Sequence, residues 1–465
     1  MRKTLRYTAI ALITAISGTS MAQDLRTGYF TESNLYRHDL NPAIENEEGY
    51  YSIPFIGNVD AKMMGNFGYE QIVRKNPLYP DRSDKKVTSF MNPYLSNPLK
   101  GFSSGDNHLD GELKETLMSV GFKKWGGYNT VELNVRGAAN LCVPYKFFQF
   151  AAEAENQAYD IGDINMSGHL FAELSAGHSR KINDKLRVGG KAKLLVGMAD
   201  VNVKMEDVMV NLSQADKWIV SANAQSDVSM NGFKYLSSSR PYYTSDGRAQ
   251  YINDIDASPG APSGFGLAVD AGLVYKVNDD FKVSASLLDL GAIVWTNDYR
   301  ASNDASTFVF DGFHDVSANS DSPNKLDNKA DGYADQLLDF ANLRDKGDEG
   351  VRITGIGATV SAGCEYTIPT FRMLKVGLLG SARFNGPYSW TEGRLIGNIT
   401  PVDWFEGAVS LGINSYSANF GFMANFHSKK VNFFIGMDSL LGKLSSEMIP
   451  LSGNGGVSLG LNIKM

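Results

Sequence analysis

Long stretches of this chain alternate apolar and polar residues with a period of two, and this pattern constrains the fold more than any other feature. The clearest case runs from Leu186 to Met198, where an apolar face alternates with one that carries Lys191 and Lys193. Successive side chains of a β-strand point to opposite faces. Strands of globular proteins typically have about five or six residues, whereas a tilted membrane-crossing strand needs about 9 to 11. The length of this segment therefore favours a strand that crosses a membrane.

Two pairs of alternating segments are joined by tight polar turns. Leu170–Ala176 leads through the turn at 181–185 into the strand just described, and Phe265–Tyr275 leads through the turn at 278–280 into Phe281–Leu287. Alternating segments joined by such turns predict antiparallel hairpins.

The pattern recurs along the rest of the chain. It breaks at Leu288–Gly291, which predicts a β-bulge or the end of the span. The other alternating segments are Ile53–Phe67, Val131–Arg136, Trp218–Met230, Thr307–Phe313, Val351–Tyr366, Leu374–Arg383, Phe405–Asn414, Ala418–Phe426, Val431–Asp438 and Val457–Met465. Together the segments predict an all-β fold, a transmembrane antiparallel β-barrel of about 14 strands with a polar lumen.

Composition agrees with a barrel. The mean hydropathy is −0.21, and no stretch reaches the roughly 18 consecutive apolar residues of a spanning helix. The chain has 47 glycines, 25 phenylalanines and 21 tyrosines but only 15 prolines, which suits many strands with aromatic girdles. The aromatic residues expected at the membrane interfaces are Tyr275, Trp295, Trp390, Trp404, Phe405 and Phe426. Two cysteines, Cys142 and Cys364, are too few for a disulfide framework, and whether they pair is left open.

The N-terminus predicts export. Three basic residues precede an apolar run at Ala9–Ile16, and small residues ending at Ala22 form a cleavage signal. Residues 1–22 are therefore a predicted signal peptide, because the apolar run is too short for a spanning helix. The barrel is predicted over 51–465.

Long polar stretches near 231–262 and 298–350 contrast with the tight turns, so we expect them to be outer loops. Two segments, Val143–Asn156 and Tyr333–Arg344, have helical periodicity instead. They are expected to plug the barrel or to pack on its end as caps.

Charge and motifs exclude several classes of function. The net charge is −7, which argues against a nucleic-acid partner. Residues 301–350 carry eleven acidic and four basic side chains, so one segment accounts for the imbalance. The six histidines show no metal-ligand spacing, and nucleophile-elbow, phosphate-loop and dinucleotide motifs are missing. We therefore expect that the protein is not an enzyme and that it has no catalytic residue, metal ligand or cofactor.

Charged residues of both signs fall on the predicted lumen faces. They are Glu173, Arg187, Lys191, Lys193, Asp270, Lys282, Lys375, Arg383, Glu406 and Lys464. One interpretation is a charged pore lining that selects solutes. The other is a network of paired charges in a filled interior that does not conduct. A barrel of about 14 strands is wide enough to need a plug or to leave a channel, so both interpretations stand.

Several stretches also carry a family resemblance. They are Tyr36–Ala43, Ala172–Ser179, Leu186–Lys191, Gly264–Asp270, Leu288–Gly291 and Trp295. On these the chain resembles a family of bacteroidete outer-membrane β-barrel proteins of unassigned function, and it is distantly similar to the FadL-like transporters of hydrophobic compounds. Those transporters hold an N-terminal segment in the lumen as a hatch. The resemblance therefore implies a hatch or lumen segment at 23–50, with Asn41, Pro42 and Ala43 as candidate hatch residues.

The sequence thus leads to a hypothesis of passive uptake of small hydrophobic or amphiphilic solutes across the outer membrane of a Gram-negative cell. The expected partners are outer-membrane lipid and a hydrophobic small molecule. The alternative is a plugged barrel that serves as a binding or structural component and docks another envelope or secretion protein. Fold-level analogy is only a prior for either function.

Overall fold

The computed structural model describes residues 25–79, 87–214, 217–239, 250–258, 260–303, 306–310, 332–333, 336, 340–440 and 453–465. The predicted signal peptide at 1–22 lies outside these residues. In the described part of the chain, 14 wall positions close into an antiparallel barrel, as predicted. In ring order they are β1 (Tyr50–Ser52) with β2 (Val59–Gly65), β5 (Asp106–Lys124), β6 (Gly127–Pro144), β7 (Ala158–Lys181), β8 (Leu186–Gln214), β12 (Gly264–Lys276), β13 (Phe281–Trp295), β17 (Arg352–Gly355) with β18 (Ala358–Thr367), β19 (Leu374–Phe384), β20 (Trp390–Val402), β21 (Phe405–Asn414), β22 (Ala418–His427), β23 (Val431–Met437) and β24 (Gly455–Lys464).

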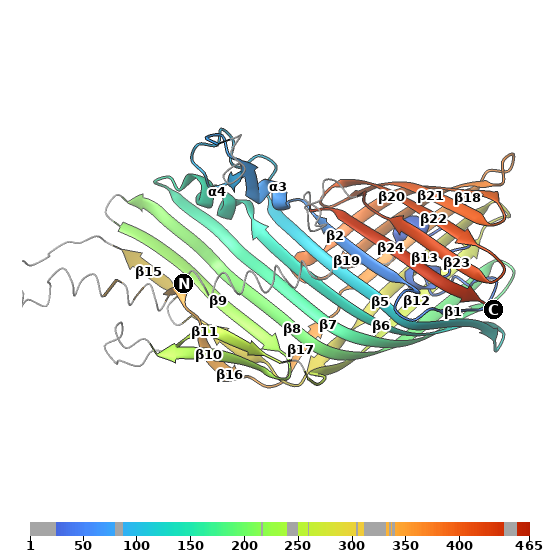
Figure 1. Ribbon diagram of the computed structural model, residues 1–465, viewed down its shortest axis with the longest axis horizontal. Coiled ribbons are helices and arrows are strands. Elements are labelled where there is room, and N and C mark those ends of the chain that lie inside the picture. The colour runs from blue at the N-terminus through green and yellow to red at the C-terminus, as the bar shows by residue number, and fades with distance from the viewer. Residues whose placement is uncertain are drawn as a thin grey trace, which may run out of the picture.

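Pairing of the first and last wall strands closes the ring. Strands β1 and β2 pair with β24 on one side and with β5 on the other. Each closing register is antiparallel, so every wall strand has a partner on both sides, and closure removes the exposed edges of an open sheet. Figure 1 shows these strands tilted across the molecule, with β1 and β24 meeting near the C-terminus.

The alternation pattern does not predict two of the wall strands, β5 and β20. In β5 the register with β6 shifts between Thr116 and Met118, so the period of two is interrupted. In β20 the apolar Trp390 and Ile396 are buried in the interior, whereas the outward Gly393 has no side chain. Both departures mix the two faces, and periodicity alone cannot detect such strands.

The outward face of the wall is apolar. Leu194 of β8, Leu267 of β12 and Leu411 of β21 are 54%, 66% and 61% exposed, respectively, whereas the charged residues that alternate with them point inward. An apolar exterior around a polar interior is the arrangement of membrane barrels. Among the described residues, no helix is long and apolar enough to cross a membrane.

Strands on one side of the barrel extend well past the ring. β8 pairs with β12 only as far as Gly197, and from Asp200 onward it pairs with β9. Figure 1 shows β7, β8 and β9 projecting beyond the other wall strands at the end away from the C-terminus. The remaining strands are β3 (Val73–Lys75), β4 (Val87–Ser89), β9 (Lys217–Ser229), β10 (Phe233–Ser239), β11 (Gln250–Ala257), β14 (Tyr299–Ser302), β15 (Thr307–Phe310) and β16 (Arg344–Asp348).

This extension corrects the expectation of simple loops at 231–262 and 298–350. The first stretch contains the hairpin of β10 and β11. The second contains β14 and β15, which both pair with β9, and β16, which pairs with β14. Residues 311–331 of the second stretch lie outside the described residues. Strand β15 lies within the predicted segment Thr307–Phe313, whereas β10, β11, β14 and β16 are short, so only their partners in the folded sheet reveal them.

Among the described residues, helices are few and short. Those with both bounds described are η1 (Arg26–Gly28), α2 (Arg37–Leu40), α3 (Tyr69–Ile72), α4 (Tyr145–Glu153) and η2 (Gly386–Tyr388). The helix α4 confirms the prediction for Val143–Asn156, and the ring of its Phe148 stacks on Phe102 at 4.1 Å between centroids. The aromatic side of α4 thus packs on neighbouring loops as a cap. In the second predicted helix, Tyr333–Arg344, described residues such as Tyr333 and Phe340 are helical, but Arg344 begins β16.

Candidate functional site

The N-terminal segment, defined here as residues 25–49, lies inside the closed ring. It consists of η1, α2 and turns, and none of its residues is in a strand. The Tyr29 hydroxyl lies 2.9 Å from Oγ of Ser284 in β13, and the Tyr36 hydroxyl donates to Oδ1 of Asn462 in β24 at 2.8 Å. These two strands belong to different arcs of the ring. A segment that contacts both must occupy the interior.

The candidate hatch residues form a turn against the wall. Oδ1 of Asn41 accepts a hydrogen bond from the backbone N–H of Ala43 at 3.0 Å, a local turn typical of asparagine. Nδ2 of Asn41 donates to the carbonyl oxygens of Leu273 in β12 and Ala285 in β13, both at 3.2 Å. One amide side chain therefore shapes the turn and attaches it to two adjacent wall strands.

Two wall glycines make room for this turn. A Cβ atom on Gly272 would stand 2.1 Å from Oδ1 of Asn41, and one on Gly189 would stand 2.1 Å from the carbonyl oxygen of Pro42. Contacts this short are impossible for a side chain, so glycine is required where the segment approaches the strand backbone. Part of the glycine content of the strands thus serves the fit of the N-terminal segment.

Asp39 is the centre of a buried charge cluster. Its carboxylate pairs with Nζ of Lys114 at 2.5 Å and also with Lys191, which in turn pairs with Glu132 at 2.7 Å. His38 contacts Asp39 through Nδ1 at 3.1 Å. Burial alone would raise the pKa of Asp39, but the Lys114 and Lys191 ammonium groups hold that pKa well below its usual range. The carboxylate is therefore ionised and fastens the segment to the wall.

Glu32 provides a second attachment, nearer the short turns. It pairs with Lys375 at 2.8 Å and with Lys282 at 3.3 Å. Burial would raise the pKa of Glu32, but Lys375 above all lowers it to about 2. Glu406 of β21 completes this contact, because its carboxylate accepts the backbone N–H groups of Glu32 and Ser33 at 2.9 and 2.8 Å. Carboxylates thus come from both the segment and the wall, whereas the ammonium groups come from the wall.

Two more charged wall residues pair with the later part of the segment. Arg187 forms an ion pair with Glu45, and Lys464 pairs with Glu48 at 2.6 Å. These pairs are partly exposed, so each contributes little to stability. They do show that charged wall residues pair with oppositely charged residues of the segment on this side as well.

Arg26 anchors the first described turn of the segment. Its backbone N–H donates to Oδ2 of Asp438 at 3.0 Å, and its guanidinium pairs with Glu392 at 3.1 Å. Arg394 also contacts Glu392, at 2.9 Å. The Arg26 guanidinium lies 4.1 Å from the centre of the Trp390 ring, a cation–π contact.

The aromatic residues predicted at the membrane interfaces divide into two groups. Trp404, Tyr275 and Phe426 are 59%, 39% and 39% exposed on the outside of the barrel. Trp390 and Trp295 were expected there too, but they are 3% and 0% exposed, so that prediction is wrong for them. The two tryptophans are buried on the lumen side by contacts with Arg26 and with neighbouring strands. A single sequence does not reveal such contacts.

A second charge network belongs entirely to the wall. Lys193 pairs with Asp270 at 2.8 Å and with Asp289 at 2.6 Å, and Arg136 clasps Asp289 with two hydrogen bonds of 2.7 and 2.8 Å. Arg136 also pairs with Glu173 at 2.8 Å. Four strands, β6, β7, β8 and β12, are thereby joined to β13 across the lumen.

Asp289 reaches this network because β13 is bulged. The register between β12 and β13 shifts between Val269 and Ala271, and Asp289 has a φ of +59°. This confirms the irregularity predicted at Leu288–Gly291. The backbone N–H of Asp289 donates to Oδ1 of Asp270 at 2.7 Å, which supports the strained conformation.

Arg383 pairs with Glu112 of β5 at 3.0 Å. The structure therefore brings the charged residues of the predicted set against the N-terminal segment, against each other or against further charged residues of the wall. Five central partners were not identified from the sequence: Asp39, Lys114, Glu132, Arg136 and Asp289. Glu132 and Arg136 alternate within a predicted strand, a signal that could have found them, whereas Asp289 depends on the bulge.

Of the cavities that border the N-terminal segment, two concern the function most. An internal one of about 30 Å³ lies between the charge networks, with Arg26, Asp39 and Lys193 among its lining residues, and this is room for a few water molecules. A larger one of about 350 Å³ opens near the short turns, where Phe30 and Ile44 of the segment face Val274 of β12. Small-molecule sites typically have about 300 to 1,000 Å³.

An apolar cluster lies on the lumen face of the wall, farther along β8 than Lys193. Leu195 and Trp295 are 1% and 0% exposed, and Nε1 of Trp295 donates to Oγ1 of Thr354 at 2.7 Å. The members of the cluster are Phe171, Leu195, Ala268, Ile293, Trp295 and Ile356. A polar lumen is the rule for membrane barrels, so an apolar patch of this size inside one is unusual.

Several known structures align with most of this chain at low similarity. The toluene transporter TodX of Pseudomonas putida is 10% identical with a TM-score of 0.40, and the alignment covers 91% of this chain and 92% of that one. A Pseudomonas aeruginosa FadL homologue is 10% identical with a TM-score of 0.38, over 97% and 96% of the two chains. The CymD monoaromatic hydrocarbon channel is 8% identical with a TM-score of 0.37, over 93% and 92%. This distant likeness to FadL-like barrels is the one that the resemblance implied.

No curated protein sequence matches the chain. A family model does match it, over residues 42–438, and its description is "Family of unknown function (DUF5723)". The match extends from the Pro42–Ala43 part of the candidate hatch to Asp438 beside β23, so it includes most of the barrel wall. The chain belongs to this family of unknown function.

Proposed function

We propose that this barrel resides in the outer membrane, after removal of residues 1–22, and takes up small hydrophobic or amphiphilic solutes passively. The N-terminal segment acts as a hatch that closes the lumen and shifts when a solute passes. Uptake is driven by the concentration gradient of the solute.

The observation that carries the proposal is how the N-terminal segment is held. Its side chains attach to the wall by ion pairs and hydrogen bonds, as at Asp39, Glu32 and Asn41, and none of its residues joins the sheet. A segment held this way can leave its seat without breaking any strand pairing. The predicted lumen residues Arg187, Lys191, Lys282, Lys375 and Glu406 then have the role of latches for the hatch.

The two surfaces on either side of the hatch support an apolar cargo. On the loop side, the cluster around Leu195 and Trp295 offers an apolar lumen surface. On the short-turn side, the cavity of about 350 Å³ next to Phe30 and Ile44 has the size of a small-molecule site. Between these two surfaces lie two separate groups of ion pairs, one around Lys193 and one around Asp39. An apolar solute cannot pass these charges unless the hatch moves.

The alternative is a plugged barrel that docks another envelope or secretion protein. The projecting strands favour it, because Met209 and Trp218 on the extension are 44% and 49% exposed. Exposed apolar groups beyond the membrane mark contact surfaces for other proteins. In this alternative the N-terminal segment never moves, and this difference separates the two functions experimentally.

A reversible lock on the hatch tests the proposal. Oγ1 of Thr27 in the segment lies 2.8 Å from Oγ of Ser410 in β21, so cysteines at these positions come within reach of a disulfide. The double variant T27C/S410C is reconstituted in liposomes, and uptake of labelled toluene, a small apolar probe, is measured before and after reduction. We expect uptake to stop when the disulfide is formed and to return when it is reduced.

A matched control cross-links the wall and leaves the hatch free. Ser361 and Ser381 face each other on β18 and β19 with their Oγ atoms 2.9 Å apart, so S361C/S381C forms a bond of the same kind between two fixed strands. Uptake by this control should not depend on its redox state. Undiminished uptake by a fully cross-linked T27C/S410C protein contradicts the hatch. No uptake by any form, despite folded barrels, contradicts transport and favours docking.

A further inference from the structure

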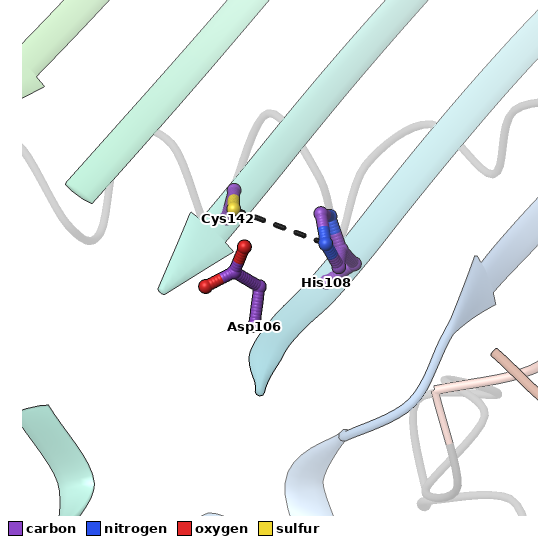
Figure 2. Close-up of side chains that lie close together, drawn as sticks. All are labelled: Asp106, His108 and Cys142. Atoms are coloured by element: carbon purple, nitrogen blue, oxygen red, sulfur yellow. Dashed lines mark hydrogen bonds between the residues drawn. The ribbon is translucent and has the colours of Figure 1, made fainter. Parts of the chain in front are cut away.

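A group of metal-ligating side chains lies at the far end of the lumen, away from the hatch. Asp106 and His108 stand at the start of β5, and Cys142 stands at the end of β6. Their ligand atoms all lie within 4.8 Å of one another, and Sγ of Cys142 is 3.9 Å from Nε2 of His108. Figure 2 shows the three side chains converging on one space beside the paired strands.

The strand register creates this convergence. His108 and Cys142 are directly opposite each other in the antiparallel pair of β5 and β6, and Asp106 is opposite Pro144. Residues two apart on a strand point to the same face, so Asp106 and His108 are on the face that also carries Cys142. The rigid sheet thus presents three different ligand types without any loop rearrangement.

We propose that Asp106, His108 and Cys142 bind a divalent cation of the zinc class. Thiolate, imidazole and carboxylate together are the ligand set of Zn²⁺, and three protein ligands leave a fourth position open. Bonds of about 2.3 Å to sulfur and about 2.0 Å to nitrogen, at a tetrahedral angle, put the two ligand atoms about 3.5 Å apart. The observed 3.9 Å needs only a small side-chain adjustment. Cys142 loses its thiol proton to solvent when the metal binds.

No described lysine or arginine pairs with the carboxylates at this position. In the part of the chain that the structure describes, no lysine or arginine forms an ion pair with Asp106 or with Asp110, the next carboxylate along this face. Asp110 is only 5% exposed, and its oxygens meet no donor in good hydrogen-bond geometry, although the Tyr416 hydroxyl lies beside it. Nδ1 of His108 is also buried without a partner among the described residues. A buried carboxylate without a counter-charge is costly, and a bound cation offsets this cost.

A second cluster shows what an occupied cation position looks like in this protein. His38, Asp39 and Glu132 also have ligand atoms within 4.8 Å of one another. There the Lys191 ammonium group contacts both carboxylates, so a positive charge from the chain already fills the position. Among the residues that the structure describes, Asp106, His108 and Cys142 have no such ammonium group, which singles them out as the metal site.

Cobalt binding tests the proposal on the purified full-length barrel in detergent, with Co²⁺ as the spectroscopic probe. We expect a thiolate-to-cobalt charge-transfer band in the near ultraviolet that saturates at one equivalent and is removed by Zn²⁺. Cys142→Ser should abolish the band, and His108→Ala should weaken cobalt binding by more than about tenfold. The partly exposed Cys364 provides the matched control, because Cys364→Ser should leave the band unchanged.

Far-UV circular dichroism verifies that each variant remains folded. If Cys142→Ser does not fold, Asp106→Asn replaces it, because Asp106 is exposed and its loss should still weaken cobalt binding. A folded wild-type protein without the band overturns the proposal. So does a band that survives Cys142→Ser or disappears in Cys364→Ser.

Discussion

The substitution Asp39→Asn should release the hatch while leaving the barrel intact. Asp39 is 6% exposed, and its carboxylate is shared by Lys114 and Lys191. Removing one partner of a buried ion pair costs about 3 to 5 kcal/mol, because the remaining charge is left buried without compensation. The lower end of this energy range applies here, since Lys191 still forms an ion pair with Glu132 at 2.7 Å. Because about 1.4 kcal/mol corresponds to a tenfold change in an equilibrium constant, the open population of the hatch should rise by at least about a hundredfold.

Hydrogen exchange measures this opening directly. Backbone N–H groups of Gly28 and Tyr29 are hydrogen-bonded within the segment, to Leu25 and Arg26, so they exchange only when the segment loosens. We expect their protection to fall by about a hundredfold in the variant, while amides of β19 and β20 keep theirs. Asp184→Asn, at an exposed turn pair with Lys181, is the control and should change neither.

Two outcomes would refute this reasoning. Unchanged protection in Asp39→Asn would mean that the charge cluster does not hold the segment. An equal loss of protection in the segment and in β19 would mean that the cluster stabilises the barrel as a whole, so the segment would be part of the core and would not move separately.

Three further predictions follow from the same contacts. Gly272→Val should displace Asn41, which its Cβ would meet at 2.1 Å, and speed exchange in the segment, whereas Gly393→Val, with nothing within 4 Å of its Cβ, should not. The pKa of Glu32 is lowered from 4.5 to about 2, so its stabilising contribution is complete above pH 4.5 and is lost as the pH falls toward 2. Hydrogen exchange of the hatch, corrected for the intrinsic exchange rate, should therefore be constant between pH 7 and 5. A rise in exchange over that range would contradict the assignment. Arg136→Met removes one of the two cations that contact the buried Asp289, while Lys193 remains at 2.6 Å, so urea unfolding should show a loss near the lower end of about 3 to 5 kcal/mol; a loss below about 1 kcal/mol, as for a surface pair, would contradict the network.

Alternation predicted most of the wall, because a strand between lipid and a polar lumen must carry apolar and polar residues in turn. The total of about 14 strands was also right, but two of the predicted segments, Trp218–Met230 and Thr307–Phe313, form β9 and β15 of the extension. The wall strands β5 and β20 were missed, because a bulge and buried apolar side chains mix their faces. The break at Leu288–Gly291 was also visible in the sequence, since a bulge shifts the alternation by one residue.

The place of each charged residue in the alternation indicated which charges face the lumen, but it did not indicate their partners. Lys191 was assigned to the lumen from its place in β8, yet its carboxylate partners are Asp39 and Glu132, which come from the segment and from β6. Such pairs depend on how the ring closes and on where the segment enters it. The sequence left a pore lining and a filled interior equally open for this reason.

The candidate metal site shows the same limit. His108 and Cys142 are 34 positions apart and match no metal-binding motif, so the sequence predicted no metal ligand. Only the antiparallel register of β5 and β6 brings them opposite each other.

The sequence by itself determined the class of fold, the tilted membrane strands and the inward direction of the charges, because these follow from local alternation and from the solvent on each face. The tertiary structure alone decided how the lumen is filled, which charges pair and which side chains meet at its far end. Those features depend on contacts between residues such as Asp39 and Lys191, whose approach is set by ring closure and by the path of the N-terminal segment, and neither is encoded in any local pattern.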